Sequence, residues 1–370
     1  PECAVDAPSR YAGKPCCGYL TMKTYNSMSD FLNSIDNSTI TGEIQTAFIK
    51  AWDKIHGYGG ENSGIELSTL YPKIMVSVSG GADSDIVIDM IERIGYPLST
   101  VQYVFFDTGL EFKATKDHLI FLEKKYGISI NRMRVPVPVP IGCKKYGLPF
   151  LSKQVSEWIN RLQRHGFKWE NRPFEELYQE YPRCKAALRW WCNEWGETSR
   201  LNISNHKWLK EFMVDNPPSF LISAGCCEGA KKRAAHKAEN EFAPDLSITG
   251  IRKYEGGARS VAYKSCFDDI PCGCSSLRLI FWFKNTDKET YEKAFDVTHS
   301  DCYLKYGLRR TGCACCPFGK DFEAELAAAE RYEPNLYRAA LHVFGKSYEY
   351  TRKYRDYREQ REKESKNENH

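Results

Sequence analysis

The most informative window of the sequence reads Ser77-Val78-Ser79-Gly80-Gly81-Ala82-Asp83-Ser84. The apolar run 73–78 leads into the two glycines, and a helical pattern follows over residues 85–93. Glycines let the backbone approach a phosphate closely, and the first amide N–H groups of a helix point at such a ligand. An ordinary strand-to-helix turn, with Ser84 as the helix cap, is the alternative interpretation. In both interpretations the window predicts a buried strand, a tight loop and a helix.

The segments that follow repeat this alternation of strand and helix. Residues 100–106 and 129–135 are predicted to be buried strands, with a helix over residues 113–126 between them. Apolar strands joined by helices are typical of a parallel sheet with right-handed crossovers. Residues 219–222 and 246–251 are predicted to be further strands. We therefore predict an α/β fold with a doubly wound, mostly parallel sheet, a helical insert and a cysteine-rich C-terminal region.

Composition excludes several classes of protein. The 370 residues carry 52 Lys+Arg and 48 Asp+Glu, which gives a net charge of +4, and 42% of the residues are hydrophobic. These values are typical of a globular chain, and so small a net charge neither favours nor excludes nucleic acid as a partner. No apolar run reaches about 18 residues, so we predict no membrane helix. Residues 1–21 lack the apolar core of a secretory signal, and we predict a cytoplasmic location.

The 15 cysteines are clustered rather than scattered. The groups are Cys16-Cys17, Cys226-Cys227, Cys272-Gly273-Cys274 and Cys313-Ala314-Cys315-Cys316. Adjacent cysteines bond each other only with strain, so a disulfide framework does not suit this pattern. In a reducing compartment, clustered thiols favour metal binding or redox chemistry. Four thiolates suit an iron–sulfur cluster and a tetrahedral zinc ion equally well.

Two further motifs follow predicted strands. Asp107-Thr108-Gly109 lies at the carboxyl end of the second strand, where doubly wound sheets bind ligands. Gly250, Arg252 and Arg259 lie in the segment 249–260, which follows another strand. Arginine binds sulfate and phosphate oxygens through paired hydrogen bonds. A polar turn and two surface arginines are the alternative interpretations, but the order of the three motifs favours an anion-binding site.

Together the motifs resemble the phosphoadenosine phosphosulfate (PAPS) reductase family of the adenine-nucleotide α-hydrolase superfamily. The resemblance rests on Ser-Gly-Gly-x-Asp-Ser, Asp-Thr-Gly-x-x-Phe and the Gly-x-Arg segment, and covers roughly residues 70–135 and 220–320. The segment 309–317 resembles phage-type and prophage-type members most closely. The resemblance implies an adenine nucleotide (PAPS, APS or ATP), with Mg²⁺ on Asp83 if the nucleotide is ATP. The implied nucleotide-binding residues are Ser77, Ser79, Gly80, Gly81, Ala82, Asp83, Ser84, Asp107, Thr108, Gly109, Gly250, Arg252 and Arg259.

The resemblance also implies a metal centre. A branch similar to adenylyl-sulfate (APS) reductases holds a [4Fe-4S] cluster with a Cys-Cys pair and a distant Cys-x-x-Cys. By that match the ligands are Cys226, Cys227, Cys313 and Cys316. Zinc is the alternative metal, and Cys302 is the alternative ligand, in place of one member of the pair. The remaining thiols that stand in apolar or basic contexts are predicted to be small buried hydrophobes, namely Cys143, Cys184 and Cys192.

The chain departs from the family at one catalytic position. Reductases of this family carry a nucleophilic cysteine in a carboxy-terminal Glu-Cys-Gly-x-His segment, whereas no cysteine follows Cys316 here. A catalytic residue is therefore not assigned. The default prediction is an enzyme that reductively cleaves PAPS or APS with an electron donor such as thioredoxin. The first alternative is ATP-dependent transfer of sulfur from a donor to nucleic acid, and the second is a zinc-containing nucleotide or nucleic-acid binding module without catalysis.

The sequence predicts six regions. Residues 1–21 are predicted to be a non-native leader, because the first patterned stretch opens at Met22. In the binding-module alternative, the tryptophans of the helical insert, among them Trp190 and Trp191, contact nucleic acid together with the basic run 231–237. Packing of the same insert on the sheet is the other interpretation. The remaining regions are an N-terminal helical segment (22–70), the phosphate-loop half of the nucleotide-binding domain (71–149), the Trp/Arg-rich insert (150–216), the rest of the nucleotide-binding domain with the cysteine cluster (217–320), and C-terminal helices with a charged tail (321–370).

Overall fold

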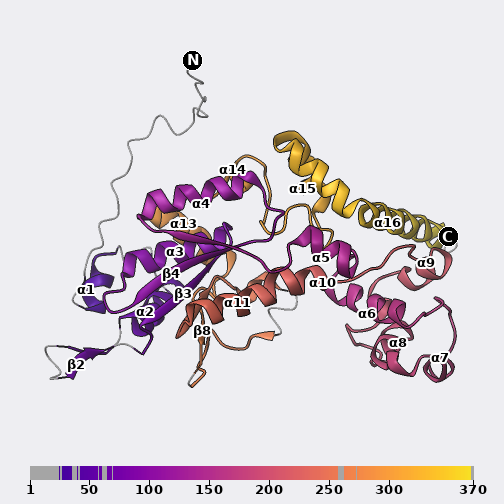
Figure 1. Ribbon diagram of the computed structural model, residues 1–370, viewed down its shortest axis with the longest axis horizontal. Helices are drawn as coiled ribbons and strands as arrows, with labels where there is room; N and C mark the ends of the chain where they lie inside the picture. Colours follow the sequence, from indigo (N-terminus) through magenta and orange to yellow (C-terminus); the bar gives the residue numbers. More distant parts are fainter. Residues whose placement is uncertain are drawn as a thin grey trace, which may run out of the picture.

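The computed structural model describes residues 25, 27–35, 40, 42–56, 58–60, 65–68, 70–256, 262–271 and 273–367 (Figure 1). Within these residues, six strands form one sheet in the order β5-β4-β3-β6-β8-β7. Neighbouring strands are parallel except β7, which pairs antiparallel with β8. The predicted α/β fold with a mostly parallel sheet is thereby confirmed. The strands are β3 (Lys73–Val78), β4 (Thr100–Asp107), β5 (Ile130–Arg134), β6 (Leu246–Thr249), β7 (Phe267–Asp268) and β8 (Ser275–Arg278).

The order of the strands reverses at β3. On one side Val78 pairs with Phe105 of β4, and on the other Val76 pairs with Ile248 of β6. The chain therefore adds β4 and β5 outward in one direction and then returns to place β6 on the opposite side of β3. In open α/β sheets, ligands bind beyond the carboxyl ends of the strands at such a reversal. The loop that follows β3 occupies this position.

Helices cover both faces of the sheet. The helices α2 (Glu43–Ile55), α3 (Ala82–Ile94) and α4 (Lys113–Tyr126) share a hydrophobic core with Ile74 and Val76 of β3. On the opposite face, Ala238 of α11 (Arg233–Phe242) packs against Met75 (Figure 1). Successive side chains of a strand point to opposite faces, so a strand covered on both faces is apolar throughout. This explains why Ile74, Met75, Val76 and Val78 of β3 are all apolar, although successive residues point to opposite faces.

Two sequence predictions are wrong in detail. The segment predicted as an N-terminal helical region also contains a two-stranded antiparallel sheet, β1 (Tyr58–Gly60) with β2 (Ile65–Ser68), because the glycines in it interrupt the helical pattern. Residues 219–222, predicted as a strand, form only an isolated bridge between Ile222 and Leu148. This segment follows Pro217 and Pro218 and leads from the insert back to the sheet domain. It therefore pairs with Leu148, in the connection that leads into the insert, rather than with a strand of the sheet.

The insert has a hydrophobic core of its own, which includes its two adjacent tryptophans. Trp190 is 2% exposed and Trp191 is 0% exposed, and Trp191 packs edge-on against Phe167 and Trp169. These two tryptophans therefore do not form a nucleic-acid contact surface, and that part of the binding-module prediction is wrong. Aromatic residues at helical spacing are here the core of a small helical unit. Its helices are α6 (Lys153–Arg164), α7 (Phe174–Glu180), η1 (Pro182–Cys184), α8 (Lys185–Trp191), η2 (Ile203–Asn205) and α9 (Leu209–Asp215).

One long helix connects the insert with the cysteine-rich region. The 34-residue helix α16 (Pro334–Asn367) is about 50 Å long at the usual rise per residue. Its first half contributes Phe344 and Tyr348 to the core around the cysteines, and Tyr350 and Tyr354 belong to the core of the insert (Figure 1). No helix in the described ranges is both long enough and apolar enough to cross a membrane. The other helices are α1 (Met28–Asn33), α5 (Val139–Tyr146), α10 (Gly225–Cys227), η3 (Glu228–Lys232), η4 (Lys253–Glu255), α13 (Asn285–Phe295), α14 (Asp301–Leu304) and α15 (Phe322–Tyr332).

Candidate functional site

The three predicted anion-binding motifs meet at one edge of the sheet. They follow β4, β3 and β6, which are neighbours in that order. Gly250, just beyond β6, lies so close to the loop that a Cβ atom on it would be 3.0 Å from the carbonyl oxygen of Asp83. The loop after β4 is adjacent because Val78 and Phe105 are paired at the ends of β3 and β4. The sheet order thus brings together three motifs that lie far apart in the sequence.

The loop itself is a closed turn that only glycine permits at its first position. Gly80 has a φ of +66°, and a Cβ atom there would lie 2.6 Å from the Cγ2 atom of Thr115. The Ser84 hydroxyl donates to the carbonyl oxygen of Gly81 at 2.7 Å, and Ser79 N donates to Ser84 Oγ at 3.3 Å. Both serines therefore hold the turn that leads into α3. The loop leads directly into the N-terminal end of the 13-residue helix α3, where negative charge is stabilised.

Two residues that the sequence analysis did not assign to the site cover this loop. The amide N–H of Ala82 donates to the hydroxyl of Tyr303 at 3.2 Å, and that hydroxyl lies 3.4 Å from Thr311 Oγ1. A Cβ atom on Gly81 would lie 2.8 Å from the same Thr311 oxygen. The Tyr303 hydroxyl therefore accepts the hydrogen bond of a loop amide, and Thr311 lies against Gly81. Tyr303 lies in α14 and Thr311 just before the cysteine motif, so the cysteine-rich region covers the loop.

Asp83 and Arg252 form an ion pair beside the loop. The Nε atom of Arg252 lies 3.1 Å from Asp83 Oδ1, and Lys288 Nζ lies 3.1 Å from the same oxygen. Arg252 is buried and also donates to Asn285 Oδ1 at 3.1 Å. Two cations already neutralise the Asp83 carboxylate, which disfavours Mg²⁺ binding there. Arg259, the second predicted arginine, lies outside the described residues.

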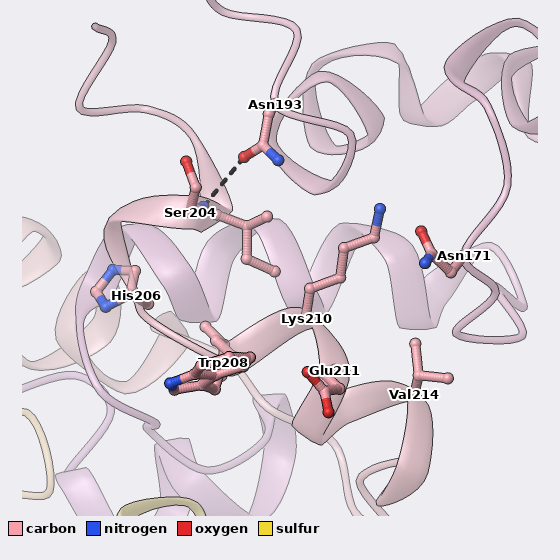
Figure 2. Close-up of a pocket in the computed structure, with 10 residues that line it drawn as sticks. Asn171, Asn193, Ser204, His206, Trp208, Lys210, Glu211 and Val214 are labelled. Carbon is pink, nitrogen blue, oxygen red and sulfur yellow. Dashed lines mark hydrogen bonds between the residues drawn. The ribbon is translucent and has the colours of Figure 1, made fainter. Parts of the chain in front are cut away.

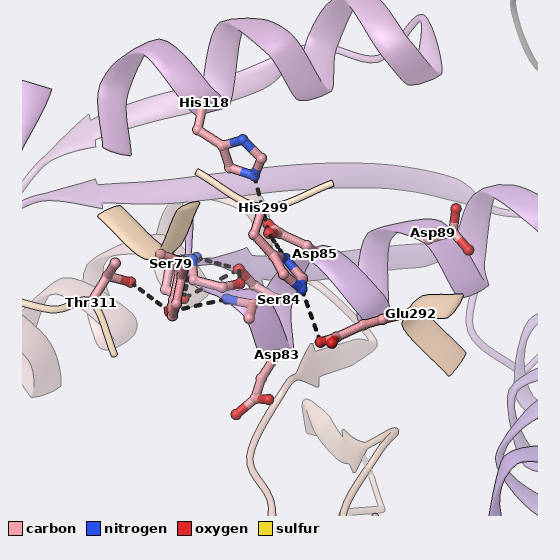
Figure 3. Close-up of polar contacts among 12 residues, drawn as sticks. Ser79, Asp83, Ser84, Asp85, Asp89, His118, Glu292, His299 and Thr311 are labelled. Atoms are coloured by element: carbon pink, nitrogen blue, oxygen red, sulfur yellow. Dashed lines mark hydrogen bonds and ion pairs between the residues drawn. The ribbon is translucent and has the colours of Figure 1, made fainter. Parts of the chain in front are cut away.

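A buried histidine–carboxylate network lies beneath the loop (Figure 3). Asp85 Oδ2 accepts hydrogen bonds from His118 at 3.0 Å and from His299 at 2.8 Å, and the other ring nitrogen of His299 is 2.8 Å from Glu292. Although burial disfavours the charged ring, these two carboxylates raise the pKa of His299 to about 9. His299 is thus an imidazolium at neutral pH. It places a positive charge next to the first turn of α3.

The carboxyl groups of Asp107 and Glu111 interact with each other in the loop after β4. Burial raises the pKa of Glu111 to about 7. Burial also opposes the ionisation of Asp107, but hydrogen bonds from Glu111 and from the Gly109 N–H, which lies 3.0 Å from Asp107 Oδ1, lower its pKa. Glu111 also accepts a hydrogen bond from Thr108 N at 2.7 Å. The predicted Asp107 therefore ionises more readily than an ordinary aspartate, and Glu111 less readily than an ordinary glutamate.

The same loop contacts the cysteine motif. The Thr108 hydroxyl lies 3.7 Å from Cys313 Sγ, and Ala314 N donates to the carbonyl oxygen of Leu110 at 2.8 Å. The carboxylate of Glu325 fixes the backbone of the cysteine motif, because it accepts a hydrogen bond from Cys315 N at 2.7 Å. The loop after β4 and the cysteine motif before α15 lie far apart in the sequence, but they are in direct contact in the structure.

The four predicted metal ligands are brought into one region. Cys227 interacts electrostatically with Cys313 and Cys316, and Cys226 with Cys316. Burial raises the pKa of Cys316 to about 12 and also raises the pKa of Cys313, whereas Lys231 partly opposes both shifts. Among the described residues, no three His, Cys, Asp or Glu side chains are arranged to hold a metal ion directly. The donor set fits a soft metal centre by its chemistry, because four thiols and one cation converge there.

The other cysteines differ in their relation to this cluster. Cys302 is fully buried and lies 3.5 Å from Thr115 Oγ1, on the side of the phosphate loop. Cys143 is hydrogen-bonded to Cys226, and this contact is the largest cause of the raised pKa of Cys226. Cys143 thus belongs to the cluster rather than to a purely apolar environment. Its signal in the sequence is weak, because it lies 83 positions before Cys226 and has no paired cysteine.

The histidine network also escaped the sequence analysis, although a signal for it existed. Asp85 directly follows Ser84, and it lies among the apolar residues of α3. A carboxylate in an apolar helical pattern requires a buried partner. Nothing in the local sequence pattern around His299 connects it with Asp85.

Comparison with known proteins agrees with the sheet and the loop. Residues 73–164 match the family model of the phosphoadenosine phosphosulfate reductase domain. The match covers about a quarter of the chain, from the first residue of β3 to the last residue of α6, and it includes no predicted metal ligand. No curated protein matches the chain. The phage-type subgroup stays a prediction.

Solved structures of two enzymes are similar to the chain at low identity. A phosphoadenylyl-sulfate (PAPS) reductase from Candida auris, in a phosphate complex, is 12% identical with a TM-score of 0.37, over 78% of this chain and 97% of that one. The U34-tRNA thiolase NcsA from Methanococcus maripaludis, with its [4Fe-4S] cluster, is 13% identical with a TM-score of 0.33, over 86% of this chain and 80% of that one.

Proposed function

We propose that this chain is an adenine-nucleotide-dependent enzyme of sulfur chemistry, in which the nucleotide phosphates bind the loop Ser79–Ser84 beside the cysteine cluster. The observation that carries the proposal is the contact of the Asp107-Thr108-Gly109 loop with the cysteine motif, through Thr108 and Cys313 at 3.7 Å. A nucleotide bound at the carboxyl ends of β3 and β4 would have its phosphate end next to these thiols. The PAPS reductase domain match over residues 73–164 supports the nucleotide assignment.

The chain offers three sets of groups to such a nucleotide. The amides of Gly81 and Ala82 would donate to phosphate oxygens at the start of α3. Arg252 and Lys288 supply positive charge on one side of the loop, and the predicted Arg259 would add to it. Asp107, held ionised by Glu111, would accept hydrogen bonds from ribose hydroxyls. For the phosphate to reach the Ala82 amide, the Tyr303 hydroxyl must move or rotate to donate to it.

The cysteine cluster would hold the metal centre. Cys226, Cys227, Cys313 and Cys316 are the proposed ligands, with a [4Fe-4S] cluster favoured over zinc by the family resemblance. When bound, the cluster would supply a thiophilic or redox-active centre next to the nucleotide. Lys231 would balance the negative charge of the thiolates. Tyr348 fixes the motif from the other side by donating to the carbonyl oxygen of Cys315 at 2.5 Å.

The domain match favours reductive cleavage of PAPS or APS as the first candidate reaction. In this reaction a thiolate attacks the sulfate sulfur, the adenosine phosphate leaves, and a dithiol such as reduced thioredoxin then releases sulfite and becomes a disulfide. The reaction needs a nucleophilic thiol that is not bound to metal. The roles of Arg252 and Lys288 in this case are to bind the anionic end of the substrate.

A second candidate reaction is favoured by the environment of the free thiols. Cys302 and Cys315 are fully buried, and Cys143 is engaged with Cys226. None of these three thiols is free to attack a bound sulfate. ATP-dependent sulfur transfer does not need such a thiol in the same position. There, ATP adenylylates an acceptor oxygen with release of pyrophosphate, and sulfur from a donor then displaces AMP.

One experiment separates the candidate functions. The full chain, purified anaerobically, is incubated with PAPS or APS and reduced thioredoxin, and in parallel with ATP, sulfide and tRNA or DNA. Sulfite in the first assay supports the reductase, and pyrophosphate with a thiolated acceptor in the second supports sulfur transfer. The absence of both products from a protein that binds nucleotide would contradict the enzymatic proposal and favour the zinc-containing binding module.

A further inference from the structure

The helical insert contains a cavity of about 450 Å³ that is unrelated to the phosphate loop (Figure 2). Its walls come from α9, η2 and the loops that precede α7 and follow α8. Its polar lining includes Asn171, Asn193, His206, Trp208 and Lys210. Pockets for small organic ligands occupy about 300–1,000 Å³, so the volume suits a single base or a comparable planar molecule.

Lys210 is the chemical centre of this cavity. The side chain is half-buried, and it has neither an ion pair nor a hydrogen bond within the described part of the chain. Its ammonium lies 5.5 Å from the ring centroid of Trp191, and burial lowers its pKa. Glu211, the carboxylate of the cavity, is instead paired with Arg361 and accepts a hydrogen bond from Tyr357 at 2.8 Å. The cavity therefore presents a donor-only cation without a protein acceptor.

Two side-chain amides flank the ammonium. Figure 2 shows Lys210 extended across the cavity, with Asn193 on one side and Asn171 on the other. Asn193 Oδ1 accepts from Ser204 N at 3.0 Å, which fixes the orientation of this amide and leaves its NH₂ group for a ligand. Asn171 makes no side-chain hydrogen bond within the described ranges. Amide and ammonium groups in such an arrangement match the hydrogen-bonding edge of a heterocycle.

Trp208 supplies an aromatic surface in a strained conformation. Its φ of +63° places it in the left-handed region, which is unfavourable for a bulky side chain. The residue immediately precedes α9, so its backbone conformation directs the half-buried indole to the cavity wall (Figure 2). His206 lies on the same wall, and burial lowers its pKa, so its ring is neutral at neutral pH. An aromatic face and a neutral ring are suited to stacking on a base.

We propose that this cavity binds a guanine base. Lys210 would donate to the O6 and N7 acceptors of guanine, which adenine and the pyrimidines do not present together. The side-chain oxygen of Asn171 would accept from the N1–H and N2–H₂ donors of guanine, the free NH₂ group of Asn193 would donate to an acceptor of the base, and Trp208 would stack on the ring. The base has two conceivable sources with the same chemistry, a free guanine nucleotide and an unpaired guanosine in a nucleic-acid strand. The proposal does not depend on the function of the phosphate loop.

The test measures binding of GMP, AMP and CMP to the full chain by calorimetry, with saturating pyrophosphate present to occupy the loop. GMP is expected to bind at least about tenfold more tightly than CMP, and the substitution Lys210→Met is expected to weaken GMP binding by about tenfold or more. The matched control is Lys207→Met, an exposed lysine on the same segment, which should leave the affinity within about twofold. If Lys210→Met alters the circular dichroism spectrum, the exposed Asn171→Ala replaces it, with an expected loss of about fivefold.

A second arm identifies the source of the base. Fluorescence anisotropy compares a short uridine strand containing one guanosine with an all-uridine strand of equal length. Tight binding of the guanosine strand with weak binding of GMP assigns the site to nucleic acid, and the reverse assigns it to the free nucleotide. The proposal is overturned if neither probe binds at millimolar concentration, if CMP binds as well as GMP, or if Lys210→Met and Asn171→Ala leave binding unchanged.

Discussion

The hydroxyl of Thr108 lies 3.7 Å from the Sγ atom of Cys313, although 205 positions separate the two residues in the chain. Thr108 is held by the loop after β4, and Cys313 opens the Cys-x-x-Cys motif. The contact makes the edge of the sheet and the cysteine region one structural unit. A nucleotide at this edge would therefore be positioned relative to the thiols by the protein backbone, and the predictions below test the parts of that unit.

Replacing Thr108 with valine keeps the shape of the side chain but removes its hydroxyl, and with it the contacts with Cys313 and with the Glu111 carboxylate. One hydrogen bond contributes about 1 kcal/mol, so we expect kcat to fall about fivefold with little change in KM, on whichever nucleotide the chain turns over. Steady-state kinetics measure the effect. Thr351→Val, a buried threonine in α16 that donates to Ser347 O at 2.8 Å, is the matched control. Equal losses in both variants would argue against a special role for Thr108.

Substitution distinguishes the proposed metal ligands from the other thiols. Cys227→Ser and Cys316→Ser should each lower the metal content and visible absorbance of anaerobically purified protein strongly, because each removes a thiolate from the cluster. Cys302→Ser should retain the metal, since its thiol contacts Thr115 rather than the cluster. Cys192→Ser, in the insert, controls for the loss of any half-buried thiol. Loss of metal from a folded Cys302→Ser variant would instead make Cys302 a ligand.

Gly80 and Gly127 form a natural pair for testing the loop. Both have positive φ values, +66° and +67°, but a Cβ atom would meet Thr115 at 2.6 Å only at Gly80 and meets nothing within 4 Å at Gly127. Gly127→Ala should therefore cost about 1 kcal/mol of unfolding free energy from backbone strain alone. Gly80→Ala should cost about 2–3 kcal/mol and also weaken pyrophosphate binding. Urea denaturation and calorimetry measure both effects, and equal costs at the two positions would contradict the packing argument.

The hydroxyl of Tyr303 accepts the hydrogen bond of the Ala82 N–H, which a phosphate oxygen would otherwise accept. Removing it in Tyr303→Phe frees the amide, so we expect pyrophosphate to bind about fivefold more tightly, the equivalent of one hydrogen bond of about 1 kcal/mol. Tyr306→Phe, which removes a hydroxyl bonded to Glu333 at 3.0 Å away from the loop, is the control. Weaker binding by Tyr303→Phe would show instead that the hydroxyl turns and donates to the phosphate.

The raised pKa of His299 makes stability depend on pH. The folded pKa is about 9 and the unfolded value is about 6.5, so the folded state binds the extra proton between these values. The resulting stabilisation, at most about 3 kcal/mol, is complete below about pH 6.5 and is lost as the pH rises through about 9. Urea denaturation from neutral pH upward should show a steeper fall for the wild type than for His299→Gln. The exposed His342→Gln should follow the wild type, and parallel curves for all three would refute the assignment.

The sheet and its loop could be read from local sequence because their determinants are local. The apolar run 73–78, the paired glycines and the helical pattern after them lie within one window, and β4 and β5 repeat the pattern. The isolated bridge at Ile222 was misread as a strand because a short apolar run does not reveal its pairing partner. The same ambiguity applied to Trp190 and Trp191, whose spacing suits both a core and an exposed surface.

The sequence by itself determined the α/β class, the phosphate loop and the clustering of cysteines, since periodicity, glycine pairs and Cys spacing are short-range signals. Only the tertiary structure decided that Tyr303 covers the loop, that Asp85 and His299 form a buried pair, and that Arg252 binds Asp83. It also decided that Cys143 joins Cys226 and that Lys210 lies in a cavity without a partner acceptor in the described chain. Each of these relationships joins segments that the order of strands and the packing of helices bring together, and no local pattern specifies that order.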